Sequence, residues 1–117
     1  MHIRSFTIDE FGIFSHTAVE DLSPGLTIFL GRNEAGKSTC LEFLRAMLTG
    51  YPDSRSREGR RLSLPRGGQG GGSLELATKS DGILRLTRRP GAGSGILTLA
   101  DADGHPRDPE VLSLIHI

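Results

Sequence analysis

Eight residues, GRNEAGKS at positions 31–38, have the types and spacing of a loop that binds phosphate. They fit G-x-x-x-x-G-K-[ST], the Walker A or P-loop pattern. Gly31 and Gly36 permit backbone angles that a side chain forbids, so the chain can come close to a phosphate. Successive backbone N–H groups and the positive end of the following helix then face the anion. The pattern therefore predicts a site for a nucleoside triphosphate.

The end of the pattern supplies the side-chain chemistry. Lys37 brings a mobile positive charge to the outer phosphates. The Ser38 hydroxyl is placed to ligate Mg²⁺, which usually keeps water and phosphate oxygens as its other ligands. We therefore predict ATP and Mg²⁺ as cofactors, with Ser38 as the metal ligand. The predicted binding residues are Gly31, Arg32, Asn33, Glu34, Ala35, Gly36, Lys37, Ser38 and Thr39.

The flanking sequence has the order of elements that a P-loop needs. Residues 26–30, LTIFL, form a short apolar run typical of a strand buried on both faces of a parallel sheet. Apolar residues then recur at helical spacing from Cys40 to Leu48, and Gly50 and Pro52 provide a stop signal. This order favours a phosphate site over the alternative, a Gly-rich turn between a strand and a helix that binds nothing.

The composition allows one small domain with a modest core. The chain has 117 residues, of which 36% are hydrophobic and 16 are glycine, and its formal net charge is zero. The single cysteine, Cys40, cannot form an internal disulfide and is expected to pack as a small apolar residue. We find no signal peptide or long apolar run, so we expect a cytoplasmic protein without a membrane partner.

The middle of the chain is basic. Residues 51–90 hold nine basic and four acidic side chains. Such a region is a candidate contact for DNA phosphates, although a solvated face or a partner-contact loop is the alternative and no aromatic residues suggest base stacking. Residues 51–72 have no periodic apolar face, and we expect a flexible loop there. Its GGQGGG run lacks a lysine and a following helix pattern, which argues against a second phosphate loop.

Alternating apolar residues predict the remaining strands. Asp101 and Asp103 could suggest a metal-binding loop, but a calcium loop would need more ligands and a closing glutamate. We therefore predict a turn at residues 101–104. The predicted fold class is α/β: a P-loop NTPase whose mixed sheet has an antiparallel N-terminal arm with the P-loop helix packed on it. The expected strands besides residues 26–30 are 2–8, 17–22, 73–79, 83–88 and 96–100, with a hairpin turn at 80–82.

The N-terminal motifs resemble a known family. Phe11-Gly12-x-Phe14 lies between two strands, and Asn33 and Thr39 accompany the P-loop pattern. This arrangement is similar to the N-terminal lobe of the ABC-type ATPase heads of the SMC-like group, which includes SbcC, RecF and RecN. The NEAGKST version is most similar to the YhaN-like branch of bacterial AAA-domain proteins. The resemblance is dense over residues 1–50 and continues weakly to about residue 105.

The resemblance implies a function that this chain can perform only in part. In the family, ATP lies between two heads, and a C-terminal lobe supplies the signature motif, the Walker B acidic pair and a switch histidine. The chain has none of these, so residues 1–111 are expected to be a partial head without catalytic residues. It would bind ATP without turnover. The full protein would be an ATPase acting in DNA repair, including double-strand break repair, or chromosome maintenance, as a head-to-head homodimer.

Other assignments stay open at this point. Phe11, Phe14 or Arg4 could lie near the base, although both phenylalanines are also candidate core residues. Residues 112–117, LSLIHI, resemble a translated sequencing adapter and are expected to be a non-native tail, with a genuine helix or strand start as the alternative. A small-molecule or nucleotide kinase and a non-enzymatic nucleic-acid module are the two alternative functions.

Overall fold

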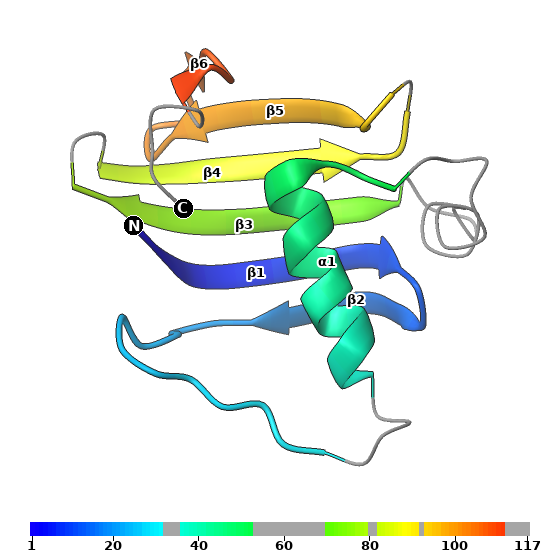
Figure 1. The fold of residues 1–117 in the computed structure, drawn as a ribbon. Helices are drawn as coiled ribbons and strands as arrows, with labels where there is room; N and C mark the ends of the chain where they lie inside the picture. The colour runs from blue at the N-terminus through cyan, green and yellow to red at the C-terminus, as the bar shows by residue number, and fades with distance from the viewer. Residues whose placement is uncertain (32–35, 53–69, 80–81, 92, 112–117) are drawn as a thin grey trace.

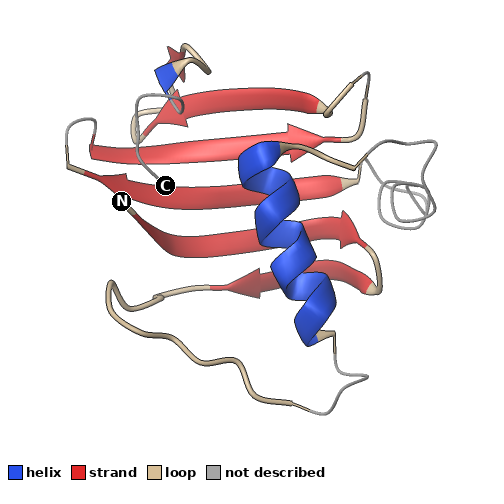
Figure 2. Cartoon of the chain, viewed as in Figure 1, coloured by secondary structure: helices blue, strands red, loops and turns tan. Residues whose placement is uncertain are grey.

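In the part of the chain that the structure describes, an antiparallel sheet carries the helix α1 across one of its faces (Figures 1 and 2). The computed structural model describes residues 1–31, 36–52, 70–79, 82–91 and 93–111. Six strands pair in the order β2-β1-β3-β4-β5-β6. The elements are β1 (His2–Phe11), β2 (Phe14–Val19), α1 (Lys37–Thr49), β3 (Gly71–Thr78), β4 (Gly82–Arg89), β5 (Ile96–Asp101) and β6 (Pro106–Arg107).

The strands that flank α1 in the sequence, β2 and β3, do not pair with each other, but both pair with β1. β1 lies between β2 and β3, and Phe6 of β1 stands opposite Val19 of β2 and Leu74 of β3. The β1–β2 hairpin closes tightly, with Phe11 paired to Phe14 and Gly12 at φ 57°. β1 and β3 are far apart in the sequence, and α1 lies between them. After α1 the chain rejoins the sheet as β3, which pairs with β1.

Strand alternation places one apolar face of the sheet beneath α1. Phe43 and Met47 of α1 are fully buried there. The Phe43 ring centroid lies 5.9 Å from that of Phe6 and 5.4 Å from that of Phe11, the latter edge to face. Aromatic pairs at these distances stabilise beyond the area they bury. The rest of this core comes mainly from the sheet: Ile8, Leu74, Leu76, Leu84, Leu86 and Leu99.

Polar and charged side chains occupy the positions that alternate with the core residues. Glu75 of β3 pairs with Arg4 of β1 at 3.2 Å, and Arg89 of β4 pairs with Asp9 of β1. Antiparallel sheets commonly have one face exposed to solvent, and these ion pairs lie on that face. The arrangement explains how a chain with only 36% hydrophobic residues still encloses a core.

Residues 26–30 do not form the predicted buried strand. Leu26 is 85% exposed and Leu30 is 90% exposed, and the segment runs as an extended coil (Figure 1). Among the described residues the sheet is antiparallel throughout, so the predicted mixed sheet is also wrong here. The physical reason is that an inner parallel strand needs hydrogen-bonding strands on its edges, and the described chain places none beside this segment.

The predicted helix and the other predicted strands are confirmed with shifted ends, and β3 and β4 pair as predicted, while residues 80–81 of the predicted hairpin turn lie outside the described residues. β2 begins at Phe14 rather than at residue 17, because the turn before it is only two residues long, and β3 begins at Gly71 rather than at residue 73. The short β6 was not predicted. Residues 53–69 of the predicted loop and the tail 112–117 lie outside the described residues. No helix in the described part of the chain is long and apolar enough to span a membrane.

We predict that Phe43→Ala destabilises the chain by about 3–5 kcal/mol, because it deletes a buried ring from the contact between α1 and the sheet. Leu41→Ala is the matched control, since Leu41 lies on the same helix but is 58% exposed. Urea denaturation followed by circular dichroism measures both free energies of unfolding. Equal losses in the two variants would contradict the placement of α1.

Candidate functional site

The candidate site lies where the P-loop pattern meets the start of α1. Gly36 precedes the helix with φ 94° and ψ 18°, a left-handed conformation that favours glycine. The first helical hydrogen bond runs from the Cys40 N–H to the Gly36 carbonyl at 2.9 Å. Gly36 makes no side-chain cap, and the first turn holds no acidic residue. The N–H groups of this turn therefore keep their capacity to bind an anion.

The β1–β2 turn lies against Gly36. A Cβ added at position 36 would lie 2.6 Å from Cζ of Phe14 and 2.9 Å from Cδ1 of Ile13. Position 36 thus requires glycine for two reasons, its backbone angle and its neighbours. Sequence reasoning missed Ile13, which is 59% exposed beside the loop. Its place in the FGIF turn was the only available signal.

Lys37 connects the two ends of the P-loop pattern. Its ammonium donates a hydrogen bond to the carbonyl oxygen of Gly31. Lys37 and Ser38 are both exposed at the helix start, as a ligand-binding lysine and hydroxyl must be. The structure therefore brings Gly31, Gly36, Lys37 and Ser38 together. The other predicted binding residues before the helix, Arg32, Asn33, Glu34 and Ala35, lie outside the described residues.

The next two residues of α1 face the protein. Thr39 is 8% exposed, so its predicted role as a second hydroxyl at the ligand stays a prediction. Cys40 is a half-buried free cysteine packed against the core, as its place on the apolar helix face predicted. Burial raises the pKa of the Cys40 thiol, which keeps it protonated and poorly reactive at neutral pH.

The three residues named as possible base contacts lie in different surroundings. Phe11 is 1% exposed and packs on Phe43, so its alternative assignment as core is confirmed. Arg4 pairs with Glu75 on the sheet. Phe14 lies beside the loop, because its ring is the nearest neighbour of a Cβ added at Gly36.

Of the described cations in the basic middle of the chain, Lys79 is exposed and the three arginines contact other groups of the protein. Arg85 donates to the Ser73 hydroxyl at 3.3 Å, and Arg89 is paired with Asp9. Arg88 is 6% exposed. The remaining arginines of the region, Arg55, Arg57, Arg60, Arg61 and Arg66, lie outside the described residues. A DNA contact there stays a prediction.

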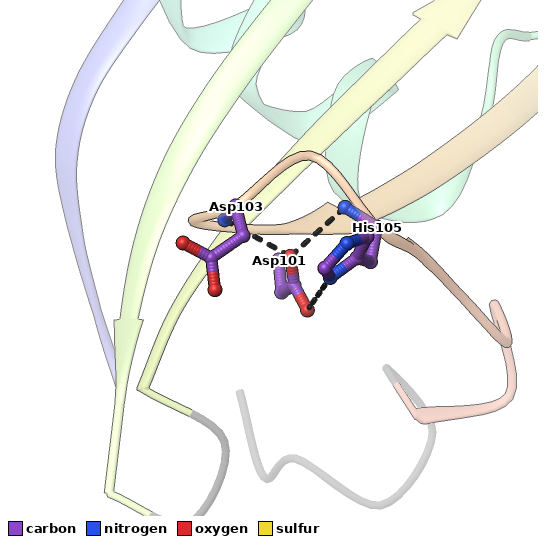
Figure 3. A group of neighbouring side chains, drawn as sticks. All are labelled: Asp101, Asp103 and His105. Carbon is purple, nitrogen blue, oxygen red and sulfur yellow. Dashed lines mark hydrogen bonds and ion pairs between the residues drawn. The ribbon is translucent and has the colours of Figure 1, made fainter.

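Asp101, Asp103 and His105 lie together at the turn between β5 and β6 (Figure 3). The Asp101 carboxylate accepts the backbone N–H of Asp103 at 3.0 Å and that of His105 at 2.9 Å. The hydrogen bond from the His105 N–H is the main reason that the pKa of Asp101 lies below its ordinary value, and burial acts in the opposite direction. The Asp101 carboxylate therefore serves as the hydrogen-bond acceptor for the backbone N–H groups of this turn. The predicted turn is confirmed.

The far end of α1 meets the sheet at a buried tyrosine and a buried arginine. Tyr51 is 8% exposed, and its ring centroid lies 5.9 Å from that of Phe11. Its hydroxyl is buried without a hydrogen-bond partner among the described residues. Burial raises the pKa of Tyr51 to about 12, while the charges of Arg89 and Arg88 act to lower it.

Comparison with known proteins relates most of the chain to one family. The sequence profile of the AAA domain family matches residues 5–99. The uncharacterized protein YhaN of Bacillus subtilis strain 168 is 30% identical over 112 residues, which cover 96% of this chain. The chain spans 11% of the length of that relative. No solved structure matches the chain.

We predict that Gly36→Ala destabilises the chain more than Gly104→Ala does. Both glycines have similar positive φ values, 94° and 85°, so both variants strain the backbone. Only the alanine at position 36 also meets Phe14 and Ile13, because nothing lies within 4 Å of the Cβ position at Gly104. Thermal unfolding of the two variants measures the difference. A melting temperature of Gly36→Ala at or above that of Gly104→Ala would refute the contact.

We also predict that stability falls between about pH 10 and pH 12. Unfolded tyrosine loses its proton near its ordinary pKa of 10.0, whereas folded Tyr51 keeps it to about 12. Its contribution is therefore fully present below pH 10 and is lost as the pH rises toward 12. Tyr51 is the only tyrosine, so tyrosinate absorbance reports it directly. A folded-state midpoint at 10 would contradict the prediction, and Tyr51→Phe should remove this part of the pH dependence.

Proposed function

The chain belongs to the AAA domain family, an ATPase-like family, and from this we propose that residues 31–39 bind ATP together with Mg²⁺. The observation that carries the proposal is the geometry at the start of α1. An uncapped helix begins at a left-handed glycine, and a lysine ammonium lies against a carbonyl at the loop's other end. These groups are the donors that a triphosphate requires.

The described residues at the start of α1 offer groups that suit a triphosphate. The backbone N–H groups after Gly36 would hold phosphate oxygens. Lys37 would exchange its hydrogen bond with the neutral Gly31 carbonyl for a stronger, charge-assisted one to a phosphate. Ser38 would ligate Mg²⁺, whose chemistry in the site is to neutralise charge on the phosphates. The assignment of Arg32, Asn33, Glu34, Ala35 and Thr39 to the same site is part of this proposal.

ATP hydrolysis belongs, in our proposal, to a longer protein. The chain spans only 11% of the relative YhaN, and we assign no catalytic residue within residues 1–111. The exposed apolar residues at 26–30 support a missing second lobe, because large exposed apolar segments mark an interaction site. We propose that residues 1–111 are the N-terminal lobe of an SMC-like ATPase head related to SbcC, RecF and RecN, and that residues 112–117 are non-native.

The activity of the whole protein follows from this proposed relationship. Two heads would bind ATP between them as a head-to-head homodimer, and the complete ATPase would act in DNA repair or chromosome maintenance in the cytoplasm. DNA contact through the Arg-rich residues 51–72 is the least supported step. Its signature would be duplex binding that weakens steeply as the salt concentration rises.

We predict that Lys37→Ala weakens MgATP binding at least tenfold, since it removes the charge-assisted contact to the phosphates. Lys79→Ala is the matched control, because Lys79 is the chain's other lysine and lies in the turn after β3. Isothermal titration calorimetry measures both. Ser38→Ala should abolish the difference between titrations with Mg²⁺ and with a chelator. Binding by Lys37→Ala as tight as that of the parent chain would refute the site.

A further inference from the structure

Arg88 of β4 holds the C-terminal end of α1. Its guanidinium is buried, and Nε donates a hydrogen bond of 3.1 Å to the carbonyl oxygen of Met47 in the last turn of the helix. The last carbonyls of a helix have no partner within it, and they carry the negative end of its dipole. The last turn of α1 has no basic residue of its own. The complementary cation therefore comes from the sheet.

The same arginine ties down the chain that follows the helix. Nη1 of Arg88 donates to the carbonyl oxygen of Ser94 at 3.3 Å, and that oxygen also accepts the backbone N–H of Tyr51 at 2.9 Å. Gly50 packs closely against the same turn, because a Cβ added at position 50 would lie 2.5 Å from Cβ of Ser94. The end of α1, the residues after it and the turn between β4 and β5 thus meet at Arg88.

A helix of 13 residues transmits this constraint to the candidate site. α1 is about 20 Å long at 1.5 Å per residue, and its hydrogen-bonded backbone resists bending. Lys37 and Ser38 form its first two residues, with the β1–β2 turn against Gly36 at that end. A small rotation of the C-terminal end would therefore move the Lys37 and Ser38 side chains relative to the rest of the loop.

We propose that Arg88 is a positioning residue for nucleotide binding, which acts by fixing the direction of α1 from the end opposite the ligand. The inference rests on the proposed function, since it concerns the affinity of the same site for MgATP. According to this proposal, Arg88 affects the affinity for MgATP from the opposite end of α1, in addition to any effect on folding.

Three variants of the 117-residue chain test the proposal. Arg88→Met removes the donors and keeps an apolar stem, and Arg88→Lys keeps the charge without the planar fork that reaches two carbonyls. Arg85→Met is the matched control, because Arg85 lies on the same strand but is exposed and donates to the Ser73 hydroxyl of the sheet rather than to the end of the helix. Calorimetry with MgATP, well below each melting temperature, measures the dissociation constants.

We expect Arg88→Met to bind MgATP about five- to tenfold more weakly, Arg88→Lys to recover part of the loss, and Arg85→Met to match the parent. A structural role alone would lower the melting temperature of Arg88→Met and leave its dissociation constant unchanged, which would overturn the inference. Should Arg88→Met fail to fold, parental affinity in Arg88→Lys would overturn it equally. Failure of the parent chain itself to bind would instead overturn the proposed function, and with it this inference.

Discussion

The packing of Phe43 and Met47 against the apolar face of the sheet is the contact on which the other features depend. Both side chains are fully buried. Phe43 lies in the middle of α1 and Met47 in its last turn, with the P-loop pattern at the start of the helix and Arg88 at its end. Without this contact the helix would have no fixed place, since a helix of 13 residues is marginal in water on its own. The direction of Lys37 and Ser38 is set by how α1 lies on β1 and β3.

The sheet supports the helix with unequal faces. The face under α1 carries the large apolar side chains, while the other face carries ion pairs such as Arg4–Glu75 and Arg89–Asp9. Exposed pairs of this kind contribute little to stability, typically up to about 1 kcal/mol each. Stability therefore depends on the single hydrophobic core between α1 and the sheet. In its described part the chain has no second layer of structure that covers residues 26–30.

Several features could be predicted from local sequence. The period of apolar residues located α1, β1, β3, β4 and β5, and the spacing of Gly31, Gly36, Lys37 and Ser38 was enough to locate the candidate site. The predictions that were wrong concern which strands pair with one another rather than the strand propensity of a segment. Residues 26–30 read as a buried strand because they are apolar, but a strand forms only where another strand pairs with it, and the described chain supplies none.

By itself, then, the sequence determined which residues of the loop are candidates for binding phosphate and which faces the helix and strands bury, because both depend on residue types at short spacing. The tertiary structure alone decided that Phe14 and Ile13 meet Gly36, that the Lys37 ammonium reaches the Gly31 carbonyl, and that Arg88 caps a helix 41 residues before it in the chain. These contacts join positions with no periodic or motif relationship. They arise only when β1, β3 and β4 are paired and α1 has been laid across them.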